Sequence, residues 1–243
     1  METKQKDKPK NKTVLLFSGG MDSLIFNHLL EPDILLCVPH GNKYEKREIK
    51  SLYNLVNKKI IKKDKMRIDD RLYLGDFERD DAIIPNRNLY FITLAAHYGE
   101  TIYLGSVYGD RSLDKSKKFF SKCENIFNYL YQEQHWCNER KFKIGSPYKD
   151  ITKTELVKMY LDKGGKASHL KESYSCYKGD KSPCMKCKPC FRKWTALKNN
   201  GIDFYKPLFL KTEWFKEILP IIEKGKYRGR EDKEIINAIK NEN

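Results

Sequence analysis

The chain has 243 residues, with 48 Lys+Arg against 33 Asp+Glu and a formal net charge of +15. Hydrophobic residues make up 40% and aromatic residues 12%, which is enough for a core and excludes a globally disordered chain. No apolar run has the length of a membrane span, and residues 1–12 lack the apolar stretch of a secretory signal, so we expect a cytoplasmic protein. The positive charge favours anionic partners such as nucleotides or nucleic acid, although lysines spread over a solvated surface would give the same total.

Apolar segments and helix-forming segments alternate from residue 14 to residue 161. The predicted strands are residues 14–17, 34–38, 71–74, 101–104 and 142–144. The predicted helices are residues 22–30, 44–61, 88–98, 116–136 and 152–161, the last with Thr152 and Glu155 as a capping box. This alternation predicts an α/β fold, in which an open parallel sheet carries helices on both faces.

The composition divides the chain into three parts. We expect residues 1–12 to be a flexible basic tail, residues 13–165 to form the nucleotide-binding α/β domain, and residues 166–243 to form a smaller region. We expect that smaller region to contain a cysteine-rich loop, a short helix near residues 191–198 and a charged helical tail.

The stretch SGGMDS, residues 18–23, lies where the first predicted strand passes into the first helix. The leading N–H groups of a helix lack intrahelical partners, and glycines let the backbone approach an anion closely. No Gly-Lys-Ser/Thr follows, so the loop is not a P-loop that places a lysine on terminal phosphates. The loop therefore predicts a nucleotide phosphate site of the kind that suits enzymes releasing pyrophosphate whole.

Four cysteines follow in the spacing C-x7-C-x2-C-x2-C: Cys176, Cys184, Cys187 and Cys190. Two-residue gaps let neighbouring thiolates bind one ion, and four sulfurs make a closed tetrahedral site, so we expect one structural Zn²⁺ per chain. An iron–sulfur cluster is the alternative, because it also accepts four cysteines. We interpret the three scattered cysteines as small core or surface residues.

Six blocks taken together resemble one family. SGGMDS is similar to the pyrophosphate loop of the PP-loop ATP pyrophosphatases, and SYSCY followed by CMKCKPC resembles the cysteine signature of the 7-cyano-7-deazaguanine synthase (QueC) family. HGNKYEKRE (40–48), IPNRN (84–88), LGSVYGDRSLDKSKKFF (104–120) and SPYKDITKTELV (146–157) resemble further family segments in the same order. The resemblance covers residues 14–197. The family's usual sequence differs within residues 40–44 and 110–114.

The resemblance implies that 7-carboxy-7-deazaguanine, ammonia and ATP are converted to 7-cyano-7-deazaguanine (preQ0) through an adenylated carboxylate and an adenylated amide. It also implies ATP with Mg²⁺ as the nucleotide and a homodimer, whereas the lack of an apolar run predicts no membrane contact, and nucleic-acid contact is possible but not required. The residues implied for ATP and pyrophosphate are Phe17, Ser18, Gly19, Gly20, Met21, Asp22, Ser23 and Gly105.

By the same resemblance, Lys153, Arg87 and Asp110 are predicted to be catalytic. The predicted substrate residues are Asp110, Asp114, His40 and Tyr44. Each has a simpler alternative: Asp22 could cap the first helix rather than organise Mg²⁺, and Arg87 could be a surface residue. The two other aspartates could form turns, and His40 could be a hydrogen-bonded core histidine.

Other functions remain open on the sequence alone. A variant could stop at the 7-amido base, and a tRNA-modifying adenylating enzyme of the same superfamily would use the positive charge on phosphates. A zinc-ribbon nucleic-acid binder is a non-enzymatic alternative, and a related enzyme could modify a protein partner. The product could enter queuosine or modified DNA.

Overall fold

The computed structural model describes residues 11–178 and 182–242, so most of the predicted basic tail lies outside the described residues. The strands are β1 (Thr13–Leu16), β2 (Ile34–Cys37), β3 (Met66–Ile68), β4 (Thr101–Leu104) and β5 (Lys143–Gly145). They form one parallel sheet in the order β3-β2-β1-β4-β5. The strand order reverses between β1 and β4, and ligands of such sheets bind at the carboxyl ends of the strands beside this point.

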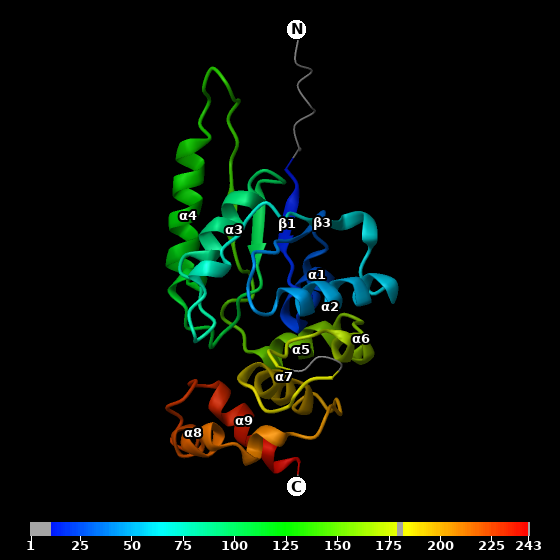
Figure 1. Cartoon of the computed structure of the whole chain (residues 1–243). Coiled ribbons are helices and arrows are strands. Elements are labelled where there is room, and N and C mark those ends of the chain that lie inside the picture. The colour runs from blue at the N-terminus through cyan, green and yellow to red at the C-terminus, as the bar shows by residue number, and fades with distance from the viewer. Residues whose placement is uncertain (1–10, 179–181, 243) are drawn as a thin grey trace.

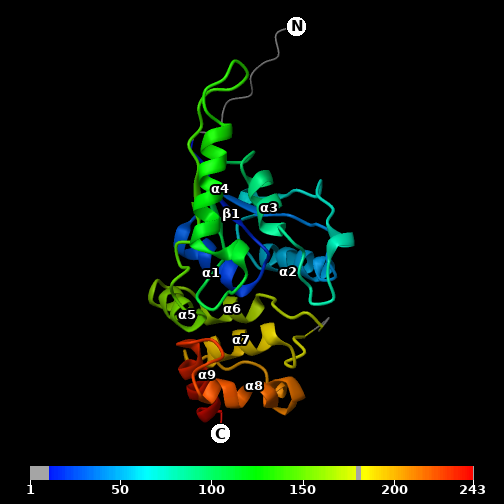
Figure 2. The ribbon, with the colours of Figure 1, turned by 90° about the vertical axis from the view of Figure 1, so that its left-hand side faces the viewer.

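Helices cover both faces of this sheet (Figures 1 and 2). The helices of the described chain are α1 (Met21–Leu30), α2 (Glu45–Asn57), α3 (Arg87–Ala95), α4 (Lys117–Leu130), α5 (Lys153–Asp162), α6 (Ala167–Glu172), α7 (Lys188–Lys198), α8 (Glu213–Glu223) and α9 (Glu231–Lys240), of which α8 and α9 lie away from the sheet. Side chains alternate across a strand, so Leu15 of β1 packs in one core with α1, α2 and α5, whereas Val14 packs in a second core with α3 and α4. The predicted α/β fold with a parallel sheet is confirmed.

The predicted third strand at residues 71–74 is wrong. The third strand is β3, which pairs with β2 at the edge of the sheet and is half exposed, so its sequence has no apolar run. Leu74 is apolar because it is buried, and its N–H donates to the carbonyl of His40 at 2.8 Å outside any strand. The helix predicted at residues 116–136 ends at Leu130, where a turn begins.

Helix α7 connects the sheet to the C-terminal helices. Its Leu197 packs in the core of α1, α2 and α5, whereas Phe191 and Trp194 pack against Phe209 and Phe215 in a third core with α8 and α9. Figure 2 shows α7 between the pair α5 and α6 and the pair α8 and α9. Among the described residues, no helix is long and apolar enough to cross a membrane.

Candidate active site

A cavity of about 510 Å³ opens at the carboxyl ends of β1 and β4. Its walls come from the loop between β1 and α1, from the loop after β4, and from α2, α5 and α7. The lining includes Ser18, Gly20, Met21, Asp22, Ser23, Tyr44, Gly105, Asp110 and Lys153. Sequence segments that are far apart in the chain therefore meet at the point where the sheet order reverses.

The glycine loop is fixed in place by two neighbouring elements. Gly19 has a φ of +73°, and a Cβ there would lie 3.2 Å from Ser51 Oγ, so both backbone conformation and space favour glycine. The carbonyl of Gly19 accepts hydrogen bonds from Ser51 Oγ at 3.1 Å and from the Tyr174 N–H at 3.3 Å. Gly20 is the N-cap of α1, so Asp22 does not cap this helix and is free for another role.

Asp22 and Lys153 form an ion pair inside the cavity. Lys153 lies in the first turn of α5, which the predicted capping box holds: the Glu155 N–H donates to Thr152 Oγ1 at 3.2 Å, and the Thr152 N–H donates to Glu155 Oε2 at 2.6 Å. Burial lowers the pKa of Lys153, and the Asp22 carboxylate partly opposes this shift. Asp22 Oδ1 is buried and has no partner among the described residues. A carboxylate oxygen of this kind, beside the loop predicted to bind phosphate, fits the ligands of Mg²⁺.

Asp110 is surrounded by positive charge. Its carboxylate accepts from Arg192 Nη1 at 2.7 Å, lies 3.6 Å from Lys115 Nζ, and accepts from the Val107 N–H at 3.3 Å. Although burial alone would favour the neutral acid, Lys115, Arg192 and Lys153 hold the pKa of Asp110 far below its usual range. Asp110 is therefore a fixed anion that orients cations, and is poorly suited to act as a general base.

Several predicted site residues do not belong to the described lining of this cavity: Phe17, Gly19, His40, Arg87 and Asp114. The ring of His40 is buried; its Nδ1 lies 2.8 Å from the carbonyl of Val38, and Asn42 Nδ2 lies 2.8 Å from its Nε2. Burial lowers the pKa of His40, as expected for a neutral core histidine. The guanidinium of Arg87 lies 5.9 Å from the ring of Phe91.

Other lining residues were missed by sequence reasoning: Arg47, Glu48, Tyr174, Tyr177, Arg192, Lys193 and Arg228. Tyr177 stacks on Tyr44, with ring centroids 4.3 Å apart, and burial raises the pKa of Glu48. Lys193 donates to the carbonyl of Ser173 at 2.5 Å, and its burial lowers its pKa to about 7. Arg192 and Lys193 closely follow Cys190, the last cysteine of the cluster. This closeness in sequence was the one signal that could have pointed to them as site residues.

The four cysteine sulfurs lie within 4.8 Å of one another. Cys187 Sγ lies 3.4 Å from Cys190 Sγ and 4.0 Å from Cys176 Sγ. A tetrahedral Zn²⁺ with Zn–S bonds of about 2.3 Å would place its sulfurs roughly 3.8 Å apart, so the residues fit one ion. An iron–sulfur cluster fits less well, because its cysteines bind different irons. N–H groups of Lys178 and Cys184 also donate to Cys176 Sγ, as is common for a metal thiolate.

Comparison with known proteins agrees with this arrangement. Residues 48–201 match the family model described as queuosine biosynthesis protein QueC. A 7-cyano-7-deazaguanine synthase of Prochlorococcus marinus subsp. pastoris is 28% identical, over 79% of this chain and 99% of that protein. The synthase of Archaeoglobus fulgidus is 27% identical, over 90% of this chain and 98% of that protein. Because the family model covers more than half of the chain, including the cysteine cluster and Lys153, the chain belongs to the QueC family.

Proposed function

We propose that this protein is an ATP-dependent synthase that converts 7-carboxy-7-deazaguanine and ammonia to 7-cyano-7-deazaguanine. The observation that carries the proposal is the cavity in which the SGGMDS loop faces Lys153 and Arg192 at the sheet's reversal point. Family membership and relatives named as 7-cyano-7-deazaguanine synthases support the choice of substrate. A homodimer remains a prediction from the resemblance, and a cytoplasmic location remains a prediction from the sequence.

The residues of the cavity support an adenylation reaction. The substrate carboxylate would attack the α-phosphorus of ATP, and pyrophosphate would leave into the loop of residues 18–23, where α1 presents its N-terminal N–H groups. Lys153 and Arg192 would stabilise the charge that develops on the phosphates. Asp22 is the candidate ligand for Mg²⁺, which supplies further charge neutralisation when bound. Catalysis of this kind depends mainly on positioning and electrostatics.

Two rounds of the same step balance the reaction. Ammonia would displace AMP from the first adenylate and give the amide, and the amide oxygen would then attack a second ATP. Loss of the second AMP leaves the nitrile. Stacked Tyr44 and Tyr177 form the most suitable wall for the planar base, since aromatic faces bind such rings by stacking.

The zinc site would have a structural role, which is to fix the position of α7. Cys187 is the N-cap of α7 and Cys190 lies in its first turn, so an ion on these thiolates fixes the helix that carries Arg192 and Lys193. A closed site with four sulfur ligands has no open position for substrate.

Mass spectrometry of the base after incubation with Mg-ATP, ammonium and 7-carboxy-7-deazaguanine tests the proposal. We expect the nitrile together with AMP and pyrophosphate. Accumulation of the amide alone would support the variant that stops at the 7-amido base. If no AMP forms with folded, zinc-loaded protein, the assignment to this substrate is wrong, and transfer RNA becomes the substrate to assay next.

A further inference from the structure

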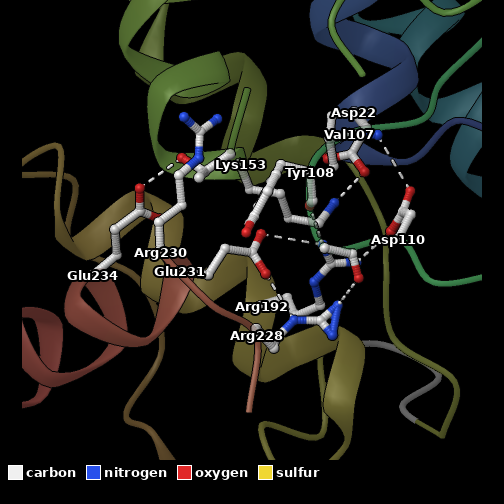
Figure 3. Close-up of polar contacts among 12 residues, drawn as sticks. Asp22, Val107, Tyr108, Asp110, Lys153, Arg192, Arg228, Arg230, Glu231 and Glu234 are labelled. Carbon is white, nitrogen blue, oxygen red and sulfur yellow. Dashed lines mark hydrogen bonds and ion pairs between the residues drawn. The ribbon is translucent and has the colours of Figure 1, made fainter. Parts of the chain in front are cut away.

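Residues 227–234 lie beyond the stretch 48–201 that the family model matches, yet Arg228 of this segment lines the candidate active site. Residues 227–230 belong to the connection between α8 and α9, and residues 231–234 begin α9. Figure 3 shows Glu231 beside Arg192, which in turn pairs with Asp110, and shows Glu234 on the side of Lys153.

The first set of contacts joins the segment to the loop after β4. Arg228 Nη2 donates to the carbonyl of Gly109 at 2.7 Å, and the guanidinium of Arg230 stacks 4.5 Å from the centre of the Tyr108 ring. Gly109 has a φ of +80°, and a Cβ there would lie 2.3 Å from Glu231 Oε2. A side chain at position 109 would therefore have to displace the Glu231 carboxylate, and the positive φ also favours glycine there.

The second set of contacts joins the segment to the start of α5. Thr152 Oγ1 donates to Glu234 Oε1 at 2.6 Å, and Arg230 Nη2 donates to Glu155 Oε2 at 3.1 Å. Thr152 and Glu155 form the capping box that precedes and supports Lys153. One short segment thus contacts both the loop that carries Asp110 and the helix end that carries Lys153.

Glu231 is the centre of this arrangement, and only 5% of its surface is exposed. One carboxylate oxygen lies 3.4 Å from Arg192 Nη2, and the other accepts from Arg228 Nε at 2.7 Å. Arg192 in turn donates to Asp110 at 2.7 Å. Arg192 Nε is buried without a partner among the described residues, and both arginines line the cavity. A buried carboxylate between two guanidinium groups holds both in one orientation.

We propose that residues 227–234 are a built-in part of the active site, in which Glu231 is a positioning residue that holds Arg192 toward the phosphates of ATP. The same carboxylate holds a second cation, Arg228, which also lines the cavity. Arg228 lies outside the residues that the family model matches. The inference rests on the proposed function in one respect, because it takes ATP as the ligand.

The test is a double-mutant cycle on nucleotide affinity, with Glu231→Gln, Arg192→Lys and the double variant. The probe is α,β-methylene-ATP with Mg²⁺, titrated by calorimetry into the full-length zinc-loaded protein. We expect Glu231→Gln to weaken binding about tenfold, as loss of an orienting partner commonly does. In the Arg192→Lys background, Glu231→Gln should weaken binding by less than about twofold, because Glu231 no longer has the Arg192 guanidinium to orient.

Glu213→Gln is the matched control, since its exposed carboxylate on α8 pairs with Lys216 away from the cavity. It should leave affinity unchanged. Arg228→Lys gives a second route if Glu231→Gln does not fold, and it should weaken binding in the same direction, because it removes the donor to Glu231.

An equal loss in both backgrounds, or wild-type affinity in Glu231→Gln, would overturn the inference and leave Glu231 as a purely structural residue. Absence of probe binding to the wild type would also overturn it. If the wild type binds the probe but forms no AMP with 7-carboxy-7-deazaguanine, the proposed substrate fails while the inference stands on the binding data.

Discussion

Two ion pairs lie in the cavity, and each pair limits what its members can do. Asp22 is paired with Lys153, and Asp110 is paired with Arg192. In each pair the carboxylate keeps a cation in a buried position where an unpaired charge would be costly. The cations are therefore already oriented in the cavity, which is the arrangement that electrostatic catalysis of the proposed adenylation requires.

Lys153→Met should lower kcat for AMP formation by roughly 10²- to 10³-fold, because it removes a preorganised charge from the phosphate site. Lys158→Met on the same helix is the control, since this lysine is exposed and pairs with Asp162. Steady-state release of pyrophosphate measures kcat for both variants. Equal rates for the two variants would remove Lys153 from the catalytic set.

Gly19→Ala should raise the KM for ATP more than about tenfold, because the added Cβ meets Ser51 and disturbs the loop. Gly164→Ala is the control, because it separates the effect of backbone strain on KM from the effect of a disturbed loop. Gly164 has a φ of +81°, and a Cβ added there would meet no atom within 4 Å, so the variant carries similar strain away from the loop. The KM for ATP of the Gly164 variant should equal that of the wild type, and a matching rise would attribute the effect to strain alone.

His40 should make the protein sensitive to acid. Its pKa in the folded state is lowered by burial, whereas the unfolded chain has a pKa of about 6.5. Above that value both states are neutral, so His40 contributes no pH dependence. Below it the unfolded state binds a proton that the folded state resists, so the free energy of unfolding falls as the pH drops.

Urea unfolding between pH 7 and pH 5 measures this contribution. The slope of the free energy of unfolding against pH should be steeper for the wild type than for His40→Gln. The difference should be at most about 1.4 kcal/mol per pH unit, the limit for one proton. Identical slopes would show that His40 is protonated equally in both states.

At the scale of elements, α7 links the cysteine cluster to the active site. Its N-terminal end carries Cys187 and Cys190, its first two turns carry Arg192 and Lys193 into the cavity, and Phe191 packs in the C-terminal core. Trp214 of α8 donates to the carbonyl of Lys186 at 2.9 Å, so the C-terminal helices also cover the cysteine loop.

Removal of zinc should therefore unfold the C-terminal region before the sheet and abolish activity. Cys187→Ser should lower the metal content below one Zn²⁺ per chain and lower Tm by more than about 5 °C, because structural zinc contributes directly to folding free energy. Cys137→Ser is the control, as this half-buried cysteine lies outside the cluster. Unchanged zinc content and Tm in Cys187→Ser would contradict the site.

Elements with strong local signals were predictable from the sequence. The capping box of Thr152 and Glu155 correctly located the start of α5, and the apolar strands β1, β2 and β4 were found within a residue or two. The edge strand β3 was missed because Arg67 and Ile68 are exposed, so burial did not select an apolar run. Helix α6 was also missed, since six residues give too little periodicity.

At the scale of the whole molecule, the active site depends on contacts between distant parts of the chain. The loop of residues 18–23 and the four cysteines were predictable because each is a local motif. The pairing of Arg192 with Glu231 and Asp110, and of Glu231 with Arg228, was not predictable, since it arises from packing between α7, the chain that leads into α9 and the loop after β4. Nothing in local spacing predicts such pairing.

The most direct test of the central claim is oxygen transfer from the substrate to AMP. 7-Carboxy-7-deazaguanine with both carboxylate oxygens labelled with ¹⁸O would be incubated with Mg-ATP and ammonium, and AMP would be analysed by mass spectrometry. Adenylation of the carboxylate and then of the amide predicts that each AMP carries one labelled oxygen, with two AMP formed for every nitrile. Unlabelled AMP accompanying the product would show that water cleaves ATP, and it would contradict the proposed mechanism.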